Sequence, residues 1–306
     1  MMDISAIIFD PLKALLSKPS LLLPMIMFIL VFTFVLVGLV FGSVQNPAIG
    51  LPVHVPVSTG GLSTIVLVLA LIVIIAALLI VPLLNGIYIV LSSQLRTGKQ
   101  LSLNAAIARS KQKYMSLLGA DFLAGLIEIA VIGGLYAIGY GILLLSLGIL
   151  GILLLLIVVL LMIAALFTLT IIFFQINAVI IIEDKRAVEG IKRSIEIGKK
   201  NPWSIIGTVL LLIVLDFVLS LVLGFIVEIL SLPFMLAGVL AVMVIYLILT
   251  GIIDGVLAAW FAMVPGTFYY SYVAKQPAAP AAAPAAAKTP PSAAAKPQTP
   301  ATPQKK

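Results

Sequence analysis

Long uncharged segments constrain this 306-residue chain more than any other feature of its sequence. A helix needs roughly 20 apolar residues to cross a hydrocarbon layer of about 30 Å. Inside that layer the backbone polar groups must be satisfied within the segment, so each long apolar run predicts a membrane-spanning helix. We expect six such helices, at 21–41, 63–91, two within 117–182, 205–230 and 236–265. The predicted fold class is therefore all-α and integral to the membrane.

Composition argues against most other classes of protein. Hydrophobic residues make up 63% of the chain and charged residues 9%, whereas about a quarter of an average soluble domain is charged. The chain has no cysteine and one histidine, His54, so disulfide frameworks, Cys/His zinc sites and catalytic Ser/His or Cys/His pairs are not expected. Gly98-Lys99 lacks the upstream glycine of a phosphate-binding loop. We predict no enzyme activity, no metal site and no cofactor.

The basic residues predict the orientation of the helices. All 18 lysines and arginines precede the first expected span, lie between spans two and three or four and five, or follow span six. Short loops rich in Lys and Arg stay in the cytoplasm. We therefore expect a multi-pass protein of the cell membrane, with both termini inside and the loop around His54 outside.

Two alternatives lose support at this point. A cleaved signal peptide has an apolar region of only about 7–15 residues, whereas the first uncharged run, 21–41, is longer and follows a segment containing Asp3 and Asp10. A net charge of +7 would suit nucleic acid in a soluble protein, but these basic residues flank apolar runs. We expect a retained first span and no nucleic-acid partner.

Three parts of the chain share one pattern, which predicts an internal repeat. The strings KPSLLLP, YMSLLGA and PWSIIGT begin at 18, 114 and 202 and align their serines, and AIARS at 106–110 matches GIKRS at 190–194. Each unit reads as a short amphipathic helix followed by a helical hairpin. The predicted units are about 1–95, 96–182 and 183–274, which together form one membrane domain over 1–274.

The short helices of these units are expected to lie at the membrane surface. In the third unit, an apolar face at helical spacing is predicted from Val188, Ile191, Ile195 and Gly198. In the first unit, Asp10-Pro11 has the features of a helix start, and Lys18-Pro19 and Asn201-Pro202 are expected to end the first and third helices. Candidate contacts to anionic lipid headgroups are the basic residues Arg109, Lys113, Lys192 and Arg193. The alternative is a solvated basic face that only sets topology.

One stretch resembles a known family. The run AVIIIEDKRAVEGIKRSIEIGKKNPWSIIGTVLLLIVL at 178–215 combines an apolar helix end, acidic residues, a small-x-x-Arg-Ser helix and a Trp before a Gly-containing span. It resembles the membrane domain attached to some bacterial glycerophosphodiester phosphodiesterases and found in related uncharacterised archaeal and bacterial membrane proteins. Gly190 departs from the usual Ala of that motif, which the second unit keeps at Ala106. The resemblance implies a six-helix membrane domain, and it carries over no catalytic residue.

Carboxylates inside the expected spans are the candidate functional residues, because acidic groups in a membrane are costly. They are Asp121, Glu128, Asp216, Glu228 and Asp254. Glu128 and Asp216 each follow the aligned serine of their unit by 12 residues, or about 18 Å of helix. No basic residue lies in a span, so these carboxylates are expected to be protonated, to reach a water-filled cavity, or to hydrogen-bond to other helices, for example to Asn85, Gln175 or Asn177. These carboxylates either line a water-filled pathway or act as protonated contacts between helices, beside close-packed glycines such as Gly251-x-x-x-Gly255.

The last segment, 275–306, is expected to be a disordered cytoplasmic tail rich in Ala, Pro and Lys, and a possible attachment point for a protein partner. Just before it, Phe268 and the neighbouring tyrosines predict an aromatic belt at the membrane interface. The whole pattern favours a non-enzymatic membrane scaffold or accessory subunit. The alternative is a small transporter or channel that moves a proton, a cation or a solute along the intramembrane carboxylates.

Overall fold

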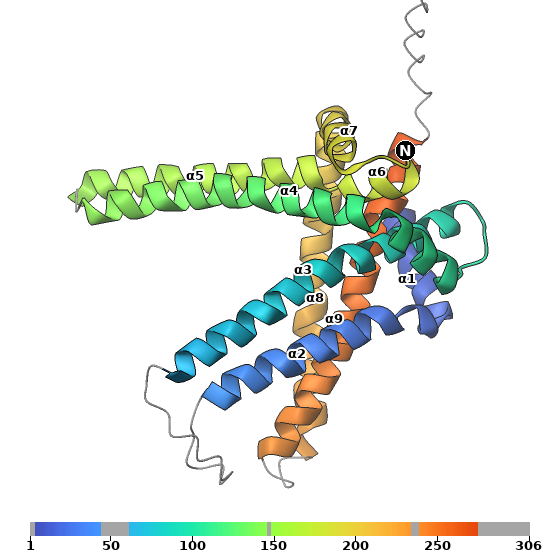
Figure 1. The fold of residues 1–306 in the computed structure, drawn as a ribbon, viewed down its shortest axis with the longest axis horizontal. Coiled ribbons are helices and arrows are strands. Elements are labelled where there is room, and N and C mark those ends of the chain that lie inside the picture. The colour runs from blue at the N-terminus through green and yellow to red at the C-terminus, as the bar shows by residue number, and fades with distance from the viewer. Residues whose placement is uncertain (1–3, 44–60, 146–147, 234–238, 275–306) are drawn as a thin grey trace, which may run out of the picture.

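The computed structural model describes residues 4–43, 61–145, 148–233 and 239–274, and every regular element in these ranges is helical. Figure 1 shows their arrangement. In chain order they are α1 (Ile4–Ser17), the 3-10 helix η1 (Pro19–Leu21), α2 (Leu23–Ser43), α3 (Gly61–Arg96), α4 (Leu103–Leu144), α5 (Gly148–Phe173), α6 (Ile176–Ile182), α7 (Ala187–Lys200), α8 (Pro202–Ser231), α9 (Val239–Phe268) and the π-helix η4 (Tyr269–Val273). The expected loop around His54 and the expected tail at 275–306 lie outside the described residues.

Five segments are long and apolar enough to cross a membrane. They are Leu71–Arg96, Leu103–Leu144, Gly148–Ile182, Pro202–Ser231 and Val242–Val273. Each of them contains or overlaps one of the expected spans two to six. The first expected span coincides with α2, whose side chains are described only as far as Val35. The expected turn between spans three and four is confirmed, since α4 ends and α5 begins within 139–151.

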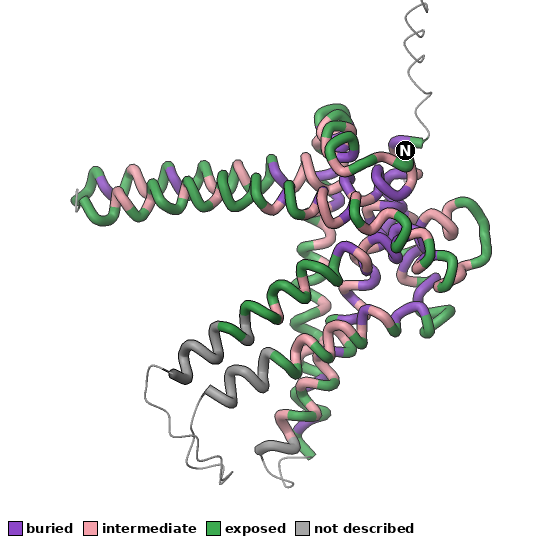
Figure 2. Tube along the Cα trace, in the orientation of Figure 1, coloured by how far each residue is buried: buried purple, intermediate pink, exposed green. Residues whose placement is uncertain are grey.

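The long helices run in pairs that diverge from a common region. In Figure 1, α4 and α5 lie along each other and point away from α8 and α9, while α2 and α3 take a third direction. Figure 2 shows that burial is concentrated where the pairs meet, and that the outer parts of the helices are mostly exposed. Most of the exposed side chains there are apolar, such as Leu144 and Ile149 at the far end of the α4–α5 pair. This distribution suits helices surrounded by lipid rather than by water.

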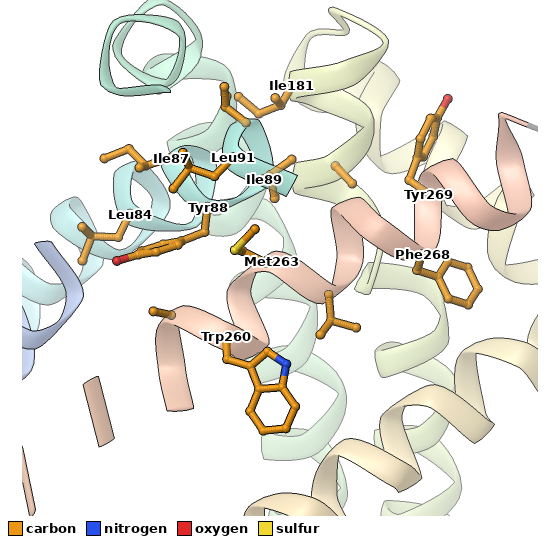
Figure 3. Close-up of a cluster of buried hydrophobic side chains, with 14 of the residues drawn as sticks. Leu84, Ile87, Tyr88, Ile89, Leu91, Ile181, Trp260, Met263, Phe268 and Tyr269 are labelled. Carbon is orange, nitrogen blue, oxygen red and sulfur yellow. The ribbon is translucent and has the colours of Figure 1, made fainter. Parts of the chain in front are cut away.

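The region where the pairs meet is the central core, formed by the buried cluster that includes Tyr88, Trp260, Met263 and Phe268. Figure 3 shows side chains from α3 and α9 meeting in this cluster, together with Ile181 of α6. Tyr88 and Trp260 are almost completely buried, so their polar atoms need partners. The Tyr88 hydroxyl donates to the carbonyl of Leu21 at 3.0 Å. Tyr88 therefore joins α3 to η1, just before α2, as well as filling space.

The expected helix start at Asp10-Pro11 is wrong, because α1 begins at Ile4 and contains Pro11 in its interior. Proline has no N–H to donate to the carbonyl four residues before it, and its ring crowds that carbonyl. Here the Ile7 carbonyl accepts a hydrogen bond from the Thr267 hydroxyl at 2.9 Å, and the Ile8 carbonyl accepts one from the Trp260 ring N–H. Tertiary donors from α9 therefore satisfy the backbone around the proline, and the helix continues.

Prolines decide whether the short helix at the start of a unit is separate from the long helix that follows it. Lys18-Pro19 ends α1 and Asn201-Pro202 ends α7, as expected. The second unit has Tyr114-Met115 at the corresponding place, and there the expected surface helix and span three form one continuous helix, α4, of 42 residues. The separate short helix expected in that unit is therefore wrong, because nothing interrupts the backbone hydrogen bonds.

The apolar face expected for α7 is confirmed only in part, because Gly198 is buried and Ile191 and Ile195 are half-buried, but Val188 is exposed. Its buried residues are Gly190, Ser194, Ile197 and Gly198, whereas Val188 is 55% exposed. A Cβ added at Gly190 would lie 2.6 Å from Ile180 of α6, and one at Gly198 would lie 2.8 Å from a backbone oxygen of α5. The helix packs through its small residues because its backbone approaches these neighbours closely.

The glycine pair expected to pack closely does so. Gly251 and Gly255 of α9 are buried against α2, and a Cβ added at Gly255 would lie 2.6 Å from the Cα of Ile26. At Gly251 an added Cβ would lie 2.7 Å from Leu30. Small residues four apart on one helix let two backbones approach closely, which is how helices associate where no hydrophobic effect drives them.

Candidate functional site

The five candidate carboxylates do not converge on one site. Asp121 is half-buried on α4, whereas the other four are exposed: Glu128, Asp216, Glu228 and Asp254. Among the described residues none of these five forms an ion pair. They lie on three helices of two pairs that diverge from the central core (Figure 1). No single pocket for a substrate results from this arrangement.

Asp121 has one of its expected partners. Its carboxylate lies near the side chain of Asn177, which is on α6 just after the break between α5 and α6. Gln175, at that break, is fully buried, and its side-chain amide has no hydrogen-bond partner among the described residues. The break therefore places polar side chains between α4 and the central core.

Glu128 lines a cleft of about 440 Å³ between α4 and α5. The other lining residues are apolar except for Thr170 and Gly133. Glu128 and Asp121 lie seven residues apart on α4, which puts them on one face of the helix, about 10 Å apart along its axis. The α4–α5 pair thus carries polar groups at two levels.

A second acidic pair spans α8 and α9. Asp216 and Asp254 are near enough for their charges to interact, and both are exposed. Gly224 and Glu228 follow Asp216 at intervals of eight and four residues along α8, which puts them on one face of that helix. Like charges this close repel each other in a low-dielectric surrounding, so in a membrane this pair needs a proton, a cation or a polar partner.

The basic residues expected to contact lipid headgroups are mostly paired with acidic residues of the chain. Asp184 lies between Arg109 and Lys113 of α4, with 2.8 Å to the Lys113 Nζ. Hydrogen bonds from Lys113 and Arg109 hold the pKa of Asp184 below its ordinary value. Asp184 adopts a φ of 60°, a left-handed conformation that Asp tolerates better than most residues. This group, the Asp184 cluster, joins α4 to the loop before α7.

A second cluster joins α7 to the C-terminal end of the described chain. Glu183 accepts hydrogen bonds from the Arg193 Nε at 3.1 Å and from the Tyr269 hydroxyl at 2.6 Å. We call these three residues the Glu183 cluster. Arg193 also pairs with Glu196 on its own helix at 2.9 Å. Of the four candidate headgroup contacts, Lys192 alone has no ion pair in the described part of the chain, and it is exposed.

The aromatic run expected at the membrane interface is instead packed inside the molecule. Phe268 is fully buried, and Tyr269 is 6% exposed. Phe268 stacks on Tyr272 with ring centroids 4.2 Å apart, and the Tyr270 hydroxyl is 2.9 Å from that of Ser93. The expectation of a belt at the membrane interface fails because this segment turns into the central core, where the Tyr269 and Tyr270 hydroxyls have protein partners.

The matching Arg-Ser strings have matching roles. The Ser110 hydroxyl donates to the Leu83 carbonyl of α3 at 2.7 Å, and the Ser194 hydroxyl donates to the Ile172 carbonyl of α5. Each serine thus bonds the backbone of the preceding long helix. The sequence reasoning did not single out Glu183 and Asp184 as partners of the adjacent arginines. Their position, directly between an apolar helix end and a basic helix, is a signal that could have found them.

Asp184→Asn should lower the stability of the chain at neutral pH but not in acid. The folded state lowers the pKa of this carboxyl below 3.8, so its stabilising contribution is present above about pH 4 and is lost as pH falls through the folded pKa. Thermal unfolding in detergent, measured from neutral pH to pH 3, checks this. We expect the unfolding temperatures of the natural chain and of the Asp184→Asn variant to converge at the acid end. A constant difference at every pH would contradict the ion-pair explanation.

Comparisons with known proteins bear on the family of the chain rather than its activity. No curated protein and no solved structure matches it. In the described residues, no group of three or more His, Cys, Asp or Glu side chains is placed to hold a metal ion. One family model, the domain of unknown function DUF7847, matches residues 2–272, which is nearly the whole membrane domain predicted from the sequence. The chain therefore belongs to the DUF7847 family.

Proposed function

We propose that this chain is a non-enzymatic membrane scaffold or accessory subunit that binds other membrane proteins through its diverging helices. The observation that supports this most is the exposure of Glu128, Asp216, Glu228 and Asp254 on apolar helices. A carboxylate facing lipid is costly, whereas one facing a polar group of a neighbouring helix is stabilising. The exposed acidic faces of α4, α8 and α9 are therefore suited to contact with a partner helix.

The proposed topology has six spans, with α2 as the first of them. The protein is placed in the cell membrane, and both of its termini lie in the cytoplasm, because the basic residues gather on one side of the spans. The three units, 1–95, 96–182 and 183–274, are proposed as tandem repeats, supported by the matching hydrogen bonds of Ser110 and Ser194. The tail at 275–306 is proposed to reach a soluble partner or the inner surface of the membrane.

A small transporter or channel is the second candidate, favoured by the polar groups of the α4–α5 pair. Asp121 with Asn177 and Glu128 with its cleft form two polar levels along one pair of helices. Such an arrangement is what a proton or cation pathway through a membrane would use. The proposed likeness to the membrane domains of glycerophosphodiester phosphodiesterases is compatible with either function and adds no catalytic residue.

Cysteine labelling separates the two functions, because the chain has no cysteine of its own. Single cysteines at 128 and 216 are treated with a membrane-impermeant thiol reagent in sealed vesicles of each orientation, with a loop cysteine at 54 as the control. The scaffold proposal predicts labelling at 54 and none at 128 or 216. Labelling at 128 or 216 would place a mid-membrane carboxylate in water and favour the transporter instead.

A further inference from the structure

A cleft of about 510 Å³ lies where α1 meets the end of α3. Its polar lining comes from Asp10, Lys13 and Ser17 of α1 and from Arg96, the last residue of α3. The apolar part comes from Ala14, Leu95 and Leu101. Leu101 lies in the turn from α3 to α4, where Gly98 has a φ of 68° that most other residues rarely adopt.

The cleft has an excess of positive charge. Arg96 pairs with Asp10 at 3.3 Å and donates to the Ala6 carbonyl at 2.7 Å, which fixes its guanidinium at the wall of the cleft. Its Nε is buried and has no hydrogen-bond partner among the described residues. Lys13 is exposed and has no ion pair in the described part of the chain. The cleft therefore has two cations, Arg96 and Lys13, for one carboxylate, Asp10, and the Lys13 ammonium is available to bind a ligand.

The position of the cleft indicates where that ligand comes from. It lies between α1 and the C-terminal end of α3, beside the loop between α3 and α4, and lysines and arginines of the first two expected cytoplasmic segments occur in these parts of the chain. The helix α1 also exposes the apolar side chains of Phe9 and Leu16, which are 43% and 58% exposed. An apolar face beside a basic residue is typical of a helix that lies in the headgroup region of a membrane.

We propose that this cleft binds the phosphate group of an anionic phospholipid at the membrane surface. Lys13 supplies the free charge, Arg96 an oriented guanidinium, and Ala14, Leu95 and Leu101 the apolar wall against the glycerol and upper acyl region. Lysine and arginine are the usual partners of phosphate. This site differs from Arg109, Lys113 and Arg193, which are held by carboxylates of the chain itself. It requires neither of the proposed functions.

The test is a lipid titration of the full chain in detergent. Phosphatidylglycerol is added to the protein in detergent micelles that contain phosphatidylcholine, and the rise in unfolding temperature gives an apparent affinity, since a ligand of the folded state stabilises it. We expect Lys13→Gln to weaken that affinity about fivefold, the equivalent of about 1 kcal/mol for one lysine near an anionic surface. Lys13 is exposed, so this variant should fold normally.

Lys111→Gln is the matched control, because Lys111 is an exposed lysine on α4 that does not line the cleft. It should retain the affinity of the unmodified chain. Equal weakening by both substitutions, or no stabilisation by phosphatidylglycerol at all, would overturn the proposed site. Inorganic phosphate at the same phosphate concentration should not stabilise the chain. If it does so as well as the lipid, the ligand is a soluble phosphate and the assignment to a lipid is wrong.

Discussion

Trp260→Ala should cost about 3–5 kcal/mol of the free energy of unfolding, the usual range for removing a large aromatic side chain from a packed core. Trp260 is 1% exposed and lies against Phe9 and Phe261, with ring centroids 6.4 and 5.1 Å away. Its ring N–H also satisfies the Ile8 carbonyl next to Pro11. The substitution therefore leaves a cavity and a backbone carbonyl without its donor. Equilibrium unfolding of the purified chain in mixed micelles measures the loss.

The chain supplies its own control for this experiment, since its only other tryptophan, Trp203, is 81% exposed on α8. Trp203→Ala should change stability by less than about 0.5 kcal/mol. Trp260→Phe separates packing from hydrogen bonding, because it keeps most of the ring and removes the N–H; we expect a cost of about 1–2 kcal/mol. Similar effects of the two alanine substitutions would show that the central core is not packed around Trp260.

The hydrogen bond of Thr267 allows a direct test of why the helix α1 continues across Pro11. In the natural chain, Thr267→Val should cost about 1 kcal/mol, because the Ile7 carbonyl loses its donor. In a Pro11→Ala background, residue 11 regains an N–H that can bond the same carbonyl within the helix. The cost of Thr267→Val should then be smaller. If Thr267→Val costs the same in both backgrounds, the hydrogen bond of Thr267 does not compensate for the N–H that Pro11 lacks.

The positions of the long helices could be predicted from the sequence, because each depends on a local property. Uncharged runs of about 20 residues indicated where the helices lie, and Pro19 and Pro202 indicated where two surface helices end. The close packing of Gly251 and Gly255 also followed from their spacing. In each case, the physical cause lies within a few residues of its effect.

The errors share a different cause, which is contact between parts of the chain far apart in sequence. The helix does not start at Asp10-Pro11 as expected, because Thr267 and Trp260, about 250 positions away, donate to the carbonyls of Ile7 and Ile8. The apolar face of α7 was predicted from Val188, Ile191, Ile195 and Gly198, whereas the fully buried residues are Gly190, Ser194, Ile197 and Gly198, with both glycines close to α5 or α6. Hydropathy alone does not distinguish a face that meets lipid from one that meets a helix backbone. The candidate carboxylates were correctly placed on helices, but their exposure depends on how the helix pairs diverge.

Glu183→Ala is expected to have the second largest effect, a loss of about 2–3 kcal/mol in the free energy of unfolding. The Glu183 side chain is 19% exposed and accepts hydrogen bonds from both Arg193 and Tyr269. Removing it leaves a partly buried guanidinium and a phenol without their acceptor, and breaking a buried ion pair costs about 3–5 kcal/mol when no water replaces the partner. Partial exposure of Arg193 lowers the expected value.

Glu196→Ala is the matched control, because Glu196 pairs with the same arginine but its side chain is 60% exposed. An exposed pair three residues apart on a helix contributes about 0.2–0.5 kcal/mol, and this contribution should decrease further in high salt, whereas the effect of Glu183→Ala should persist. Tyr269→Phe should cost about 1 kcal/mol in the natural chain and less once Glu183 is alanine. Equal and salt-sensitive losses for the two glutamates would mean that the Glu183 cluster is solvated. In that case, α7 would not be fixed to η4, the last described helix before the segment 275–306.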